Sequence, residues 1–175
     1  QHKHSACVQV LIEAGADIER PNLYGITPIA MAASHGFADG VLQLIAAGAT
    51  VDKMWGTGGD TALISACLGG HFACAEHLLV ANADPNHKKT EGTEEYTPLW
   101  LSCERGHSEC ARLLLAHGAD ASHACRGLTP LGIAIETGNR ACSDMIQETL
   151  IVMQPTTAEV ADQEWDWISR AQGGQ

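Results

Sequence analysis

Aromatic and basic residues are both scarce in this sequence of 175 residues. Phe, Trp and Tyr make up only 5% of the chain, and 10 Lys and Arg stand against 21 Asp and Glu, which gives a formal net charge of −11. Binding to nucleic acid phosphates or to an anionic membrane surface needs a basic patch, and the sequence contains none. No apolar run approaches the roughly 18 residues that cross a bilayer. We therefore expect neither nucleic acid nor a membrane as a partner.

Sequence signatures of catalysis are also missing. The chain has no Gly-x-Ser-x-Gly elbow and no Gly-x-x-x-x-Gly-Lys phosphate loop. The run Gly56-Thr57-Gly58-Gly59 is rich in glycine, but no buried strand precedes it and no Lys follows it. It is typical of a flexible hairpin tip. We therefore expect no enzyme active site and no cofactor within these residues.

The beginning of the chain carries little targeting information. The first residue is Gln1 rather than Met, and the polar opening lacks the apolar core of a signal peptide. Val8, Leu11 and Ile12 lie at helical spacing and predict the second helix of a two-helix repeat, but no sequence for the first helix of that repeat precedes them. A terminal repeat normally presents a polar outer face, so we expect further repeats upstream in a longer native chain.

Two short phrases recur along the sequence at nearly constant spacing. Gly15-Ala16-Asp17 returns at Gly48, Asn82 and Gly118, in steps of 33, 34 and 36 residues. A second phrase keeps step with the first and begins at Gly25, Gly59, Glu95 and Gly127. Coincidence of two independent phrases predicts an array of four similar units rather than one globular core.

Each unit reads as two helices joined by turns. A Thr before the first helix is a good N-cap, and in three of the four units a Pro follows it in the first turn. The helix that follows is short and rich in small residues, and a Gly ends it. Leu pairs such as Leu78-Leu79 then mark a second helix. One unit alone has too little core, so the units must stack to bury their apolar faces.

On these phrases and this period, the sequence resembles the ankyrin repeat family over roughly residues 3 to 150. The resemblance implies an all-α ankyrin-repeat solenoid of helix-turn-helix units with short β-hairpin loops. We place a partial repeat at 1–19, full repeats at 20–52, 53–86, 87–122 and 123–154, and a capping helix with linker at 155–175. The hairpin of the 87–122 repeat is extended and acidic. The His that the family usually carries after Thr-Pro-Leu is replaced by Ala30, Ile64, Trp100 and Gly132, so we expect looser turns.

The seven cysteines raise the alternative of a metal or redox sensor. Four of them share one repeat position near the start of the second helix: Cys7, Cys74, Cys110 and Cys142. Small apolar residues packed between helices explain this spacing, and no Cys-x2-Cys pair is present for zinc. We therefore expect no metal site and no disulfide. Reduced thiols favour an intracellular location in the cytoplasm or nucleus.

The remaining function is binding of a protein or peptide. In ankyrin arrays the hairpin tips and the exposed ends of the first helices line a concave groove, and the resemblance carries this role to equivalent positions here. These positions are Leu23, Tyr24, Ile26, Ser34, His35, Trp55, Asp60, Leu68, Glu94, Tyr96, Glu104, Arg105, Arg126, Leu128 and Glu136. Tyr24 and Trp55 fit a binding role and a supporting role equally well. Tyr96 and Trp100 can instead fold back and support the neighbouring hairpin, and Trp100 fits this supporting role better. The acidic C-terminal half favours a basic partner, or it is a solvated face.

Two further expectations follow from the same resemblance. Asn86 stands where ankyrin hairpins can be hydroxylated, with Leu78 eight residues earlier. The array is expected to be a monomeric scaffold or adaptor within a longer chain. The alternative is a substrate-targeting segment of a multidomain enzyme, such as a ubiquitin-ligase adaptor or a kinase, with its catalytic part outside these residues.

Overall fold

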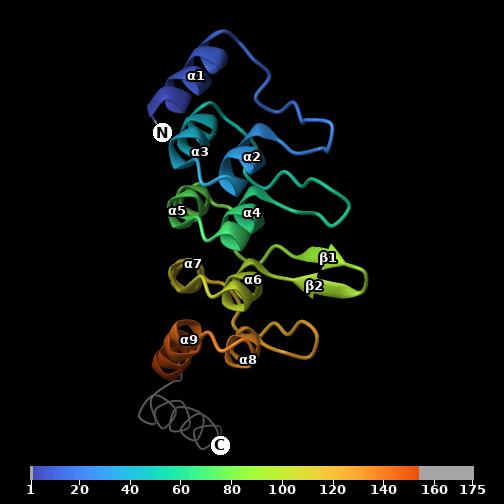
Figure 1. The fold of residues 1–175 in the computed structure, drawn as a ribbon, viewed down its shortest axis with the longest axis vertical. Coiled ribbons are helices and arrows are strands. Elements are labelled where there is room, and N and C mark those ends of the chain that lie inside the picture. Colours follow the sequence, from blue (N-terminus) through green and yellow to red (C-terminus); the bar gives the residue numbers. More distant parts are fainter. Residues whose placement is uncertain (1, 154–175) are drawn as a thin grey trace, which may run out of the picture.

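The computed structural model describes residues 2–153 and shows a stack of helix pairs (Figure 1). The predicted capping helix at 155–170 lies outside the described residues. The helices are α1 His2–Glu13, α2 Pro28–Ser34, α3 Ala38–Ala46, α4 Ala62–Gly69, α5 Phe72–Val80, α6 Pro98–Arg105, α7 Ser108–Ala116, α8 Pro130–Glu136 and α9 Arg140–Met153. Strands β1 Lys89–Glu91 and β2 Glu94–Tyr96 form one small antiparallel sheet. The all-α solenoid prediction is confirmed.

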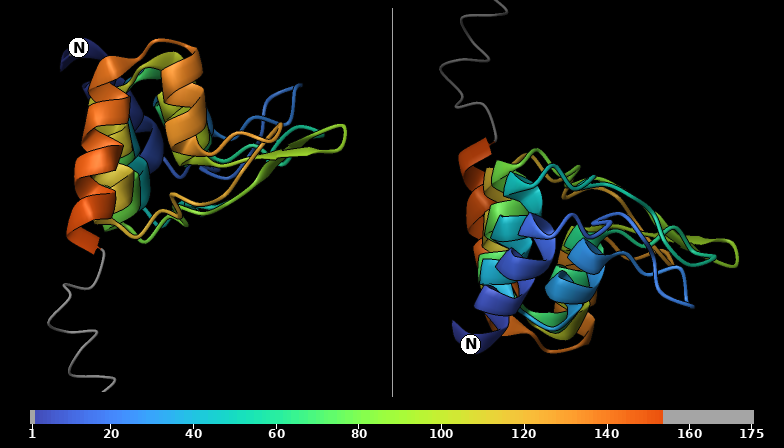
Figure 2. Two further views of the ribbon diagram at one scale, coloured as in Figure 1. Left: turned by 90° about the horizontal axis from the view of Figure 1, so that it is seen from below. Right: turned by 90° about the horizontal axis from the view of Figure 1, so that it is seen from above.

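The helices form two rows, with the hairpins projecting from one of them (Figures 1 and 2). We call α2, α4, α6 and α8 the inner helices, because they lie next to the hairpins. We call α1, α3, α5, α7 and α9 the outer helices. Each inner helix contacts the next inner helix along the stack and the outer helix of its own repeat. The outer helix α1 packs on α3, and it precedes the first described inner helix.

The Thr residues begin the inner helices as the sequence predicted. The hydroxyls of Thr27, Thr61, Thr97 and Thr129 each accept a hydrogen bond from the backbone N–H three residues later. Gly70 and Gly106 end two of these helices with φ of 67° and 75°. In this left-handed region a side chain is strained, and glycine is not.

The core lies between the two rows and is built from Leu and small residues. Leu63, Leu78, Leu99 and Leu114 are completely buried, with alanines and cysteines filling the spaces between them. Small residues allow neighbouring helices to approach closely, so the apolar faces of adjacent repeats form one continuous core.

Side chains at the start of the outer helices connect one repeat to the next. Nε2 of His71 donates a hydrogen bond to the carbonyl of Ser34 at 3.2 Å, and Nε2 of His107 donates to that of Leu68 at 3.2 Å. Asn139 fills the same role and donates to the carbonyl of Cys103 at 2.8 Å. These bonds satisfy carbonyls that the ends of the inner helices leave without helical partners.

A second series of bonds connects the turns that precede the hairpins. Glu19, Asp52 and Asn86 occupy one repeat position, two residues after the aspartate or threonine of the first phrase. Their side-chain oxygens accept from the backbone N–H of the following repeat, at Thr50, Asp84 and Asp120, over 2.6, 3.1 and 2.7 Å. This ladder connects the turns of neighbouring repeats although the usual His is absent, and looser turns stay a prediction.

The hairpins also touch one another. In the extended hairpin, Lys89 pairs with Tyr96, Thr90 with Glu95 and Glu91 with Glu94. The N–H of Thr90 donates to the carbonyl of Gly58 in the preceding hairpin at 2.8 Å. Neighbouring hairpins thus lie together and project in the same direction beside the inner helices (Figure 2).

Candidate protein-binding face

The hairpin face consists of the hairpin tips together with the C-terminal ends of the inner helices. Its most exposed part is the tip of the 20–27 hairpin, where Leu23 is fully exposed and Tyr24 is 80% exposed. The carboxamide oxygen of Asn22 accepts the backbone N–H groups of Tyr24 and Ile26 at 2.9 and 3.0 Å. The tip is therefore held by bonds from its backbone to the Asn22 side chain, and its two large apolar side chains are left in water.

The next hairpin adds a residue that the sequence analysis missed. Met54 is 61% exposed, whereas Trp55 beside it is half-buried and packs against the core. Successive residues in extended chain point to opposite sides, so the inward turn of Trp55 directs Met54 outward. The indole Nε1 of Trp55 is buried without a hydrogen-bond partner among the described residues. Trp55 therefore has mainly a supporting role.

Two predicted contact residues are buried, which corrects their assignment to the exposed groove. Tyr96 is 4% exposed and Asp60 is 8% exposed. The Tyr96 ring meets Trp100 edge-on with 5.2 Å between centroids, and the guanidinium carbon of Arg126 lies 5.4 Å from the Tyr96 centroid. Asp60 forms an ion pair with Lys89 at 3.1 Å. Both side chains are used to hold hairpins together and are not free for a partner.

Trp100 is fully buried, as the sequence analysis preferred. Its indole Nε1 donates to the carbonyl of Leu128 in the next hairpin at 2.9 Å. Leu128 and Ile26 are half-buried, so only part of each reaches the surface. The Trp that replaces the usual His thus connects two repeats through a hydrogen bond and a large apolar surface.

The ends of the inner helices contribute a polar strip. Ser34, His35, Arg105 and Glu136 are exposed there, while Leu68 and Glu104 are half-buried. His35 Nδ1 donates to the carbonyl of Met31 at 2.9 Å, and Arg105 Nε lies 3.4 Å from a carboxylate oxygen of Glu104. These local bonds leave the remaining polar atoms of the strip available to a partner.

The acidic residues of the extended hairpin are largely paired. Lys88 contacts Glu95 at 2.7 Å, and Lys89 contacts Glu91 at 2.9 Å. Hydrogen bonds from these lysines hold the pKa values of Glu91 and Glu95 below their usual range. Glu94 accepts the backbone N–H of Arg126 at 3.0 Å. The local field of this hairpin is weaker than its composition indicates.

Both polar atoms of the Asn86 side-chain amide form hydrogen bonds within the fold. Its oxygen accepts the N–H of Asp120, and its Nδ2 donates to the carbonyl of Gly118 at 3.1 Å. The side chain is thereby fixed between two repeats. Hydroxylation at Asn86 remains a prediction.

Glu19 gives this ladder a pH dependence that can be measured. Its carboxylate lies 2.8 Å from Lys53 Nζ and accepts the N–H of Thr50, and these bonds lower its pKa. A lowered folded-state pKa stabilises the protein above the unfolded pKa of about 4.3, and this contribution is lost as pH falls through the folded value. We expect Glu19→Gln to be less stable at pH 7, with the difference from wild type shrinking between about pH 5 and pH 3. Urea unfolding across this range measures it.

The matched control for Glu19 is Lys53→Met, which removes the main cause of the pKa shift. It should also reduce the pH dependence of stability, because the carboxylate then loses its cationic partner. A stability difference between Glu19→Gln and wild type that stays constant from pH 7 to pH 3 would contradict the prediction.

The cysteines pack as core residues. All except Cys7 are buried, and all seven are free thiols. Burial raises the pKa of Cys74 and of Cys110 to about 11, and it raises the pKa of Cys67 and Cys103 further. Thiols of this kind are protonated at neutral pH and are poor metal ligands or redox nucleophiles. Among residues 2–153, no three His, Cys, Asp or Glu side chains gather as a metal site.

No helix in the described part of the chain is both long and apolar enough to span a bilayer.

Comparison with known proteins assigns the class. The family model for ankyrin repeats (3 copies) matches residues 1–89 and 77–151, so the chain belongs to the ankyrin-repeat family. Ankyrin repeats are protein-interaction units that carry no catalytic machinery of their own. The chain is therefore a protein-interaction module in its general class.

Curated relatives carry the repeats within much longer chains. The chain is 33% identical over 92 residues to palmitoyltransferase Hip14 of Drosophila melanogaster, which covers 53% of this chain and 14% of the relative. It is 34% identical over 82 residues to putative palmitoyltransferase ZDHHC13 and to palmitoyltransferase ZDHHC17 of Danio rerio, with 47% of this chain and 13% of each relative covered. The chain thus spans about one seventh of the length of these relatives.

Proposed function

We propose that this chain is a non-catalytic scaffold or adaptor module that binds a protein or peptide on its hairpin face. The observation that carries the proposal is the apolar tip cluster, which we define as Leu23, Tyr24 and Met54. These side chains are exposed on two neighbouring hairpins, and an added Cβ on Gly25 would lie 3.9 Å from the backbone nitrogen of Gly56. Single exposed apolar side chains are ordinary on a protein surface, whereas several that lie close together mark an interaction site.

The chemistry of the tip cluster favours an anchored interface. Tyr gives a large rigid contact with a polar end, and Met adapts to the shape of a partner. The polar strip at the ends of the inner helices would form the rim, with Ser34 and His35 nearest in sequence to the cluster. A partner segment with one or two apolar anchors and flanking polar groups fits this arrangement.

A crosslinking capture experiment tests the proposal. The chain and its Leu23→Ser/Tyr24→Ser variant are used as baits with lysate from cells that express the protein, and captured proteins are identified by mass spectrometry. The variant is expected not to capture a specific protein that the unchanged chain captures. The affinity of the variant for that protein, prepared in recombinant form, should be reduced about 30-fold or more, as for the loss of an interface anchor. Circular dichroism verifies that the variant is folded.

The matched control is Leu42→Ser, which removes an exposed Leu from the outer helix α3. It should retain the partner, because it alters exposed apolar area away from the hairpins. Loss of the partner with Leu42→Ser and not with the tip variant would move the binding site to the outer helices. Equal retention by both variants would also reject the hairpin face.

We extend this proposal to a partner that is basic. Glu104 and Glu136 lie in the polar strip, and the hairpin carboxylates are partly neutralised by Lys88 and Lys89. Electrostatic steering by such a surface would raise the association rate at low salt and have little effect at high salt. Association rates of the captured partner at two ionic strengths measure it.

A second candidate is that the module selects substrates for an enzyme in the same polypeptide. Two of the relatives named above are palmitoyltransferases and the third is named a putative one, and this chain covers only 13–14% of their length. On this candidate the attached activity would be palmitoyl transfer rather than ubiquitin ligation or phosphorylation. An antibody raised against this chain should then detect a native polypeptide far larger than 18.5 kDa. The larger native polypeptide should also label the captured partners with a palmitate analogue, and this labelling should depend on Leu23 and Tyr24.

A further inference from the structure

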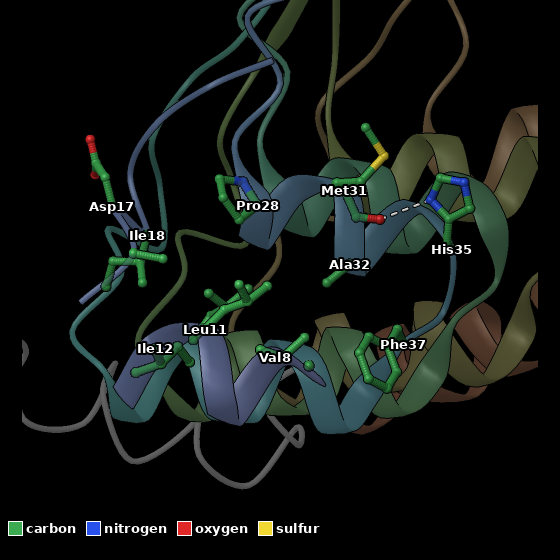
Figure 3. A pocket seen from close by; sticks show the side chains of 13 residues that line it. Val8, Leu11, Ile12, Asp17, Ile18, Pro28, Met31, Ala32, His35 and Phe37 are labelled. Atoms are coloured by element: carbon green, nitrogen blue, oxygen red, sulfur yellow. Dashed lines mark hydrogen bonds between the residues drawn. The ribbon is translucent and has the colours of Figure 1, made fainter. Parts of the chain in front are cut away.

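Exposed apolar surface at the first repeat follows from the way that the described row of repeats ends. An apolar groove of about 580 Å³ between α1 and α2 is lined by residues such as Val8, Leu11 and Met31 (Figure 3). The core that continues through the stack is open at this end. The groove is therefore explained by the repeat row and indicates no separate ligand.

The hairpin of the last repeat holds an arginine in an unusual backbone conformation. Cys125 and Leu128 exchange both backbone hydrogen bonds, at 3.0 and 2.9 Å, so Arg126 and Gly127 form a two-residue turn. Their φ values are 52° and 74°. A turn with two positive φ angles prefers Asn, Asp or Gly at its first position. The other non-glycine residue with a positive φ in the described part of the chain is Asn82, which suits this conformation.

Two contacts with the preceding repeat hold Arg126 in place. A carboxylate oxygen of Glu94 accepts its backbone N–H at 3.0 Å, and its guanidinium carbon lies 5.4 Å from the centroid of the Tyr96 ring. Tyr96 is itself buried and meets the ring of Trp100 edge-on. The arginine therefore rests on an aromatic surface that the core keeps rigid.

The charge of Arg126 remains available at the surface. The residue is exposed, and none of the carboxylates in residues 2–153 forms an ion pair with its guanidinium. Lys88, Lys89 and Arg105 differ, because each of them contacts a carboxylate. Contact with an aromatic ring does not neutralise a guanidinium, whereas a carboxylate does.

The position of Arg126 places it on the hairpin face. It precedes Thr129 by three residues, as Tyr24 of the apolar tip cluster precedes Thr27. A side chain kept in a strained backbone conformation is typical of functional positions, where something other than the fold requires it. Asn or Gly would suit the turn better, so the turn itself does not explain the arginine.

We propose that Arg126 anchors a carboxylate of the bound protein or peptide, carried by an Asp or Glu side chain. This inference rests on the proposed function, because it names one chemical group of the partner that the hairpin face binds. A guanidinium binds a carboxylate through two parallel N–H···O bonds. Because Tyr96 already restricts the arginine side chain, less conformational entropy is lost on binding. A partner of basic net charge fits this anchor if it carries one acidic residue at this point.

The test selects peptides from a phage-displayed library of short random sequences. The unchanged chain and Arg126→Asn serve as separate targets, and the selected peptides are sequenced. Peptides selected by the unchanged chain should share an Asp or Glu at one position, and those selected by the variant should lack it. A selected peptide, synthesised with Gln or Asn in place of that acid, should bind the unchanged chain about 20-fold more weakly in fluorescence anisotropy.

The variants of Arg126 separate binding from support of the fold. Asn suits the positive φ, which offsets the lost contact with Tyr96, so Arg126→Asn should melt within about 3 °C of the unchanged chain. Its affinity for the selected peptide should nevertheless fall about 20-fold. Arg126→Lys keeps the charge but not the planar pair of donors, and an intermediate loss of about fivefold is expected. The matched control is Arg112→Gln, which removes an exposed arginine from the outer helix α7 and should leave the affinity unchanged.

The anchor is rejected if the peptides selected by the unchanged chain share no acidic position, or if none of them distinguishes it from Arg126→Asn. An equal loss of affinity with Arg112→Gln also rejects it, because general charge would then explain the result. A large fall in melting temperature for Arg126→Asn with unchanged affinity would show that the arginine only supports Tyr96.

The Leu23→Ser/Tyr24→Ser variant distinguishes this inference from the proposed function. If that variant keeps full affinity for the acidic peptides, the tip cluster is rejected as a binding site while the anchor at Arg126 is supported. If that variant loses affinity for peptides that share no acidic position, the hairpin face is supported and the anchor is rejected.

Discussion

Trp100→Ala is expected to destabilise the protein by about 4 kcal/mol, the largest effect that we predict for one substitution. Trp100 is completely buried between the hairpin of its own repeat and that of the next. Removing the indole leaves a cavity, takes away the edge-on contact with Tyr96 and deprives the carbonyl of Leu128 of its donor. Urea unfolding followed by circular dichroism measures the loss.

The loss should be concentrated at one boundary in the stack. In a repeat array each unit contacts only its neighbours, so weakening the contact between α6 and the 123–128 hairpin mainly affects the two repeats that share it. Hydrogen exchange in α8 should therefore accelerate more than exchange in α2. Uniform acceleration along the stack would indicate that the array unfolds as one unit.

Trp100→Phe separates the apolar contact from the hydrogen bond. Phe keeps much of the buried surface but has no Nε1–H group, so a smaller loss of about 2 kcal/mol is expected. A loss below about 1 kcal/mol for Trp100→Ala itself would show that the side chain does not make these contacts in solution.

Local sequence chemistry predicted the helices because the same signals recur in every repeat. Thr27, Thr61, Thr97 and Thr129 each act as the expected N-cap, since an N-cap depends on residues three positions away and not on distant contacts. The inward position of Trp100 followed in the same way, because a repeat position that normally holds a buried residue stays buried when the residue changes. Repetition made both inferences reliable.

The hairpins were predicted less well because their side-chain directions depend on the neighbouring hairpin. Tyr96 and Asp60 were expected on the surface, yet Trp100 and Arg126 cover the first and Lys89 pairs with the second. These partners lie on other turns or in the next repeat. Met54 was missed for the same reason, since its exposure follows from the inward turn of Trp55.

The ladder of Glu19, Asp52 and Asn86 could have been found in the sequence. These residues share one repeat position, and each has a side-chain oxygen that can accept from the backbone. What no pattern supplied is the partner of each oxygen, because the N–H groups that they meet lie more than thirty residues away.

Leu114→Ala and Leu11→Ala form a matched pair with opposite expectations. Both residues occupy the same position of an outer helix, but Leu114 is completely buried and Leu11 is more than half exposed. We expect Leu114→Ala to cost about 3 kcal/mol, because it removes buried methyl groups and leaves a cavity in a packed core. Leu11→Ala should cost less than about 1 kcal/mol, since most of the side chain is already in water.

The comparison is made by urea unfolding of both variants at the same protein concentration. Because the two substitutions are chemically identical, the difference between them measures burial at one repeat position and removes the effect of helix propensity. Equal losses would mean that Leu11 is covered in solution by another surface. If the loss at Leu11 depends on protein concentration, that surface belongs to a second copy of the chain; if it does not, the surface belongs to the same chain. A small loss at Leu11 together with a large loss at Leu114 would show that burial, and not the residue type, sets the cost of the substitution at this repeat position.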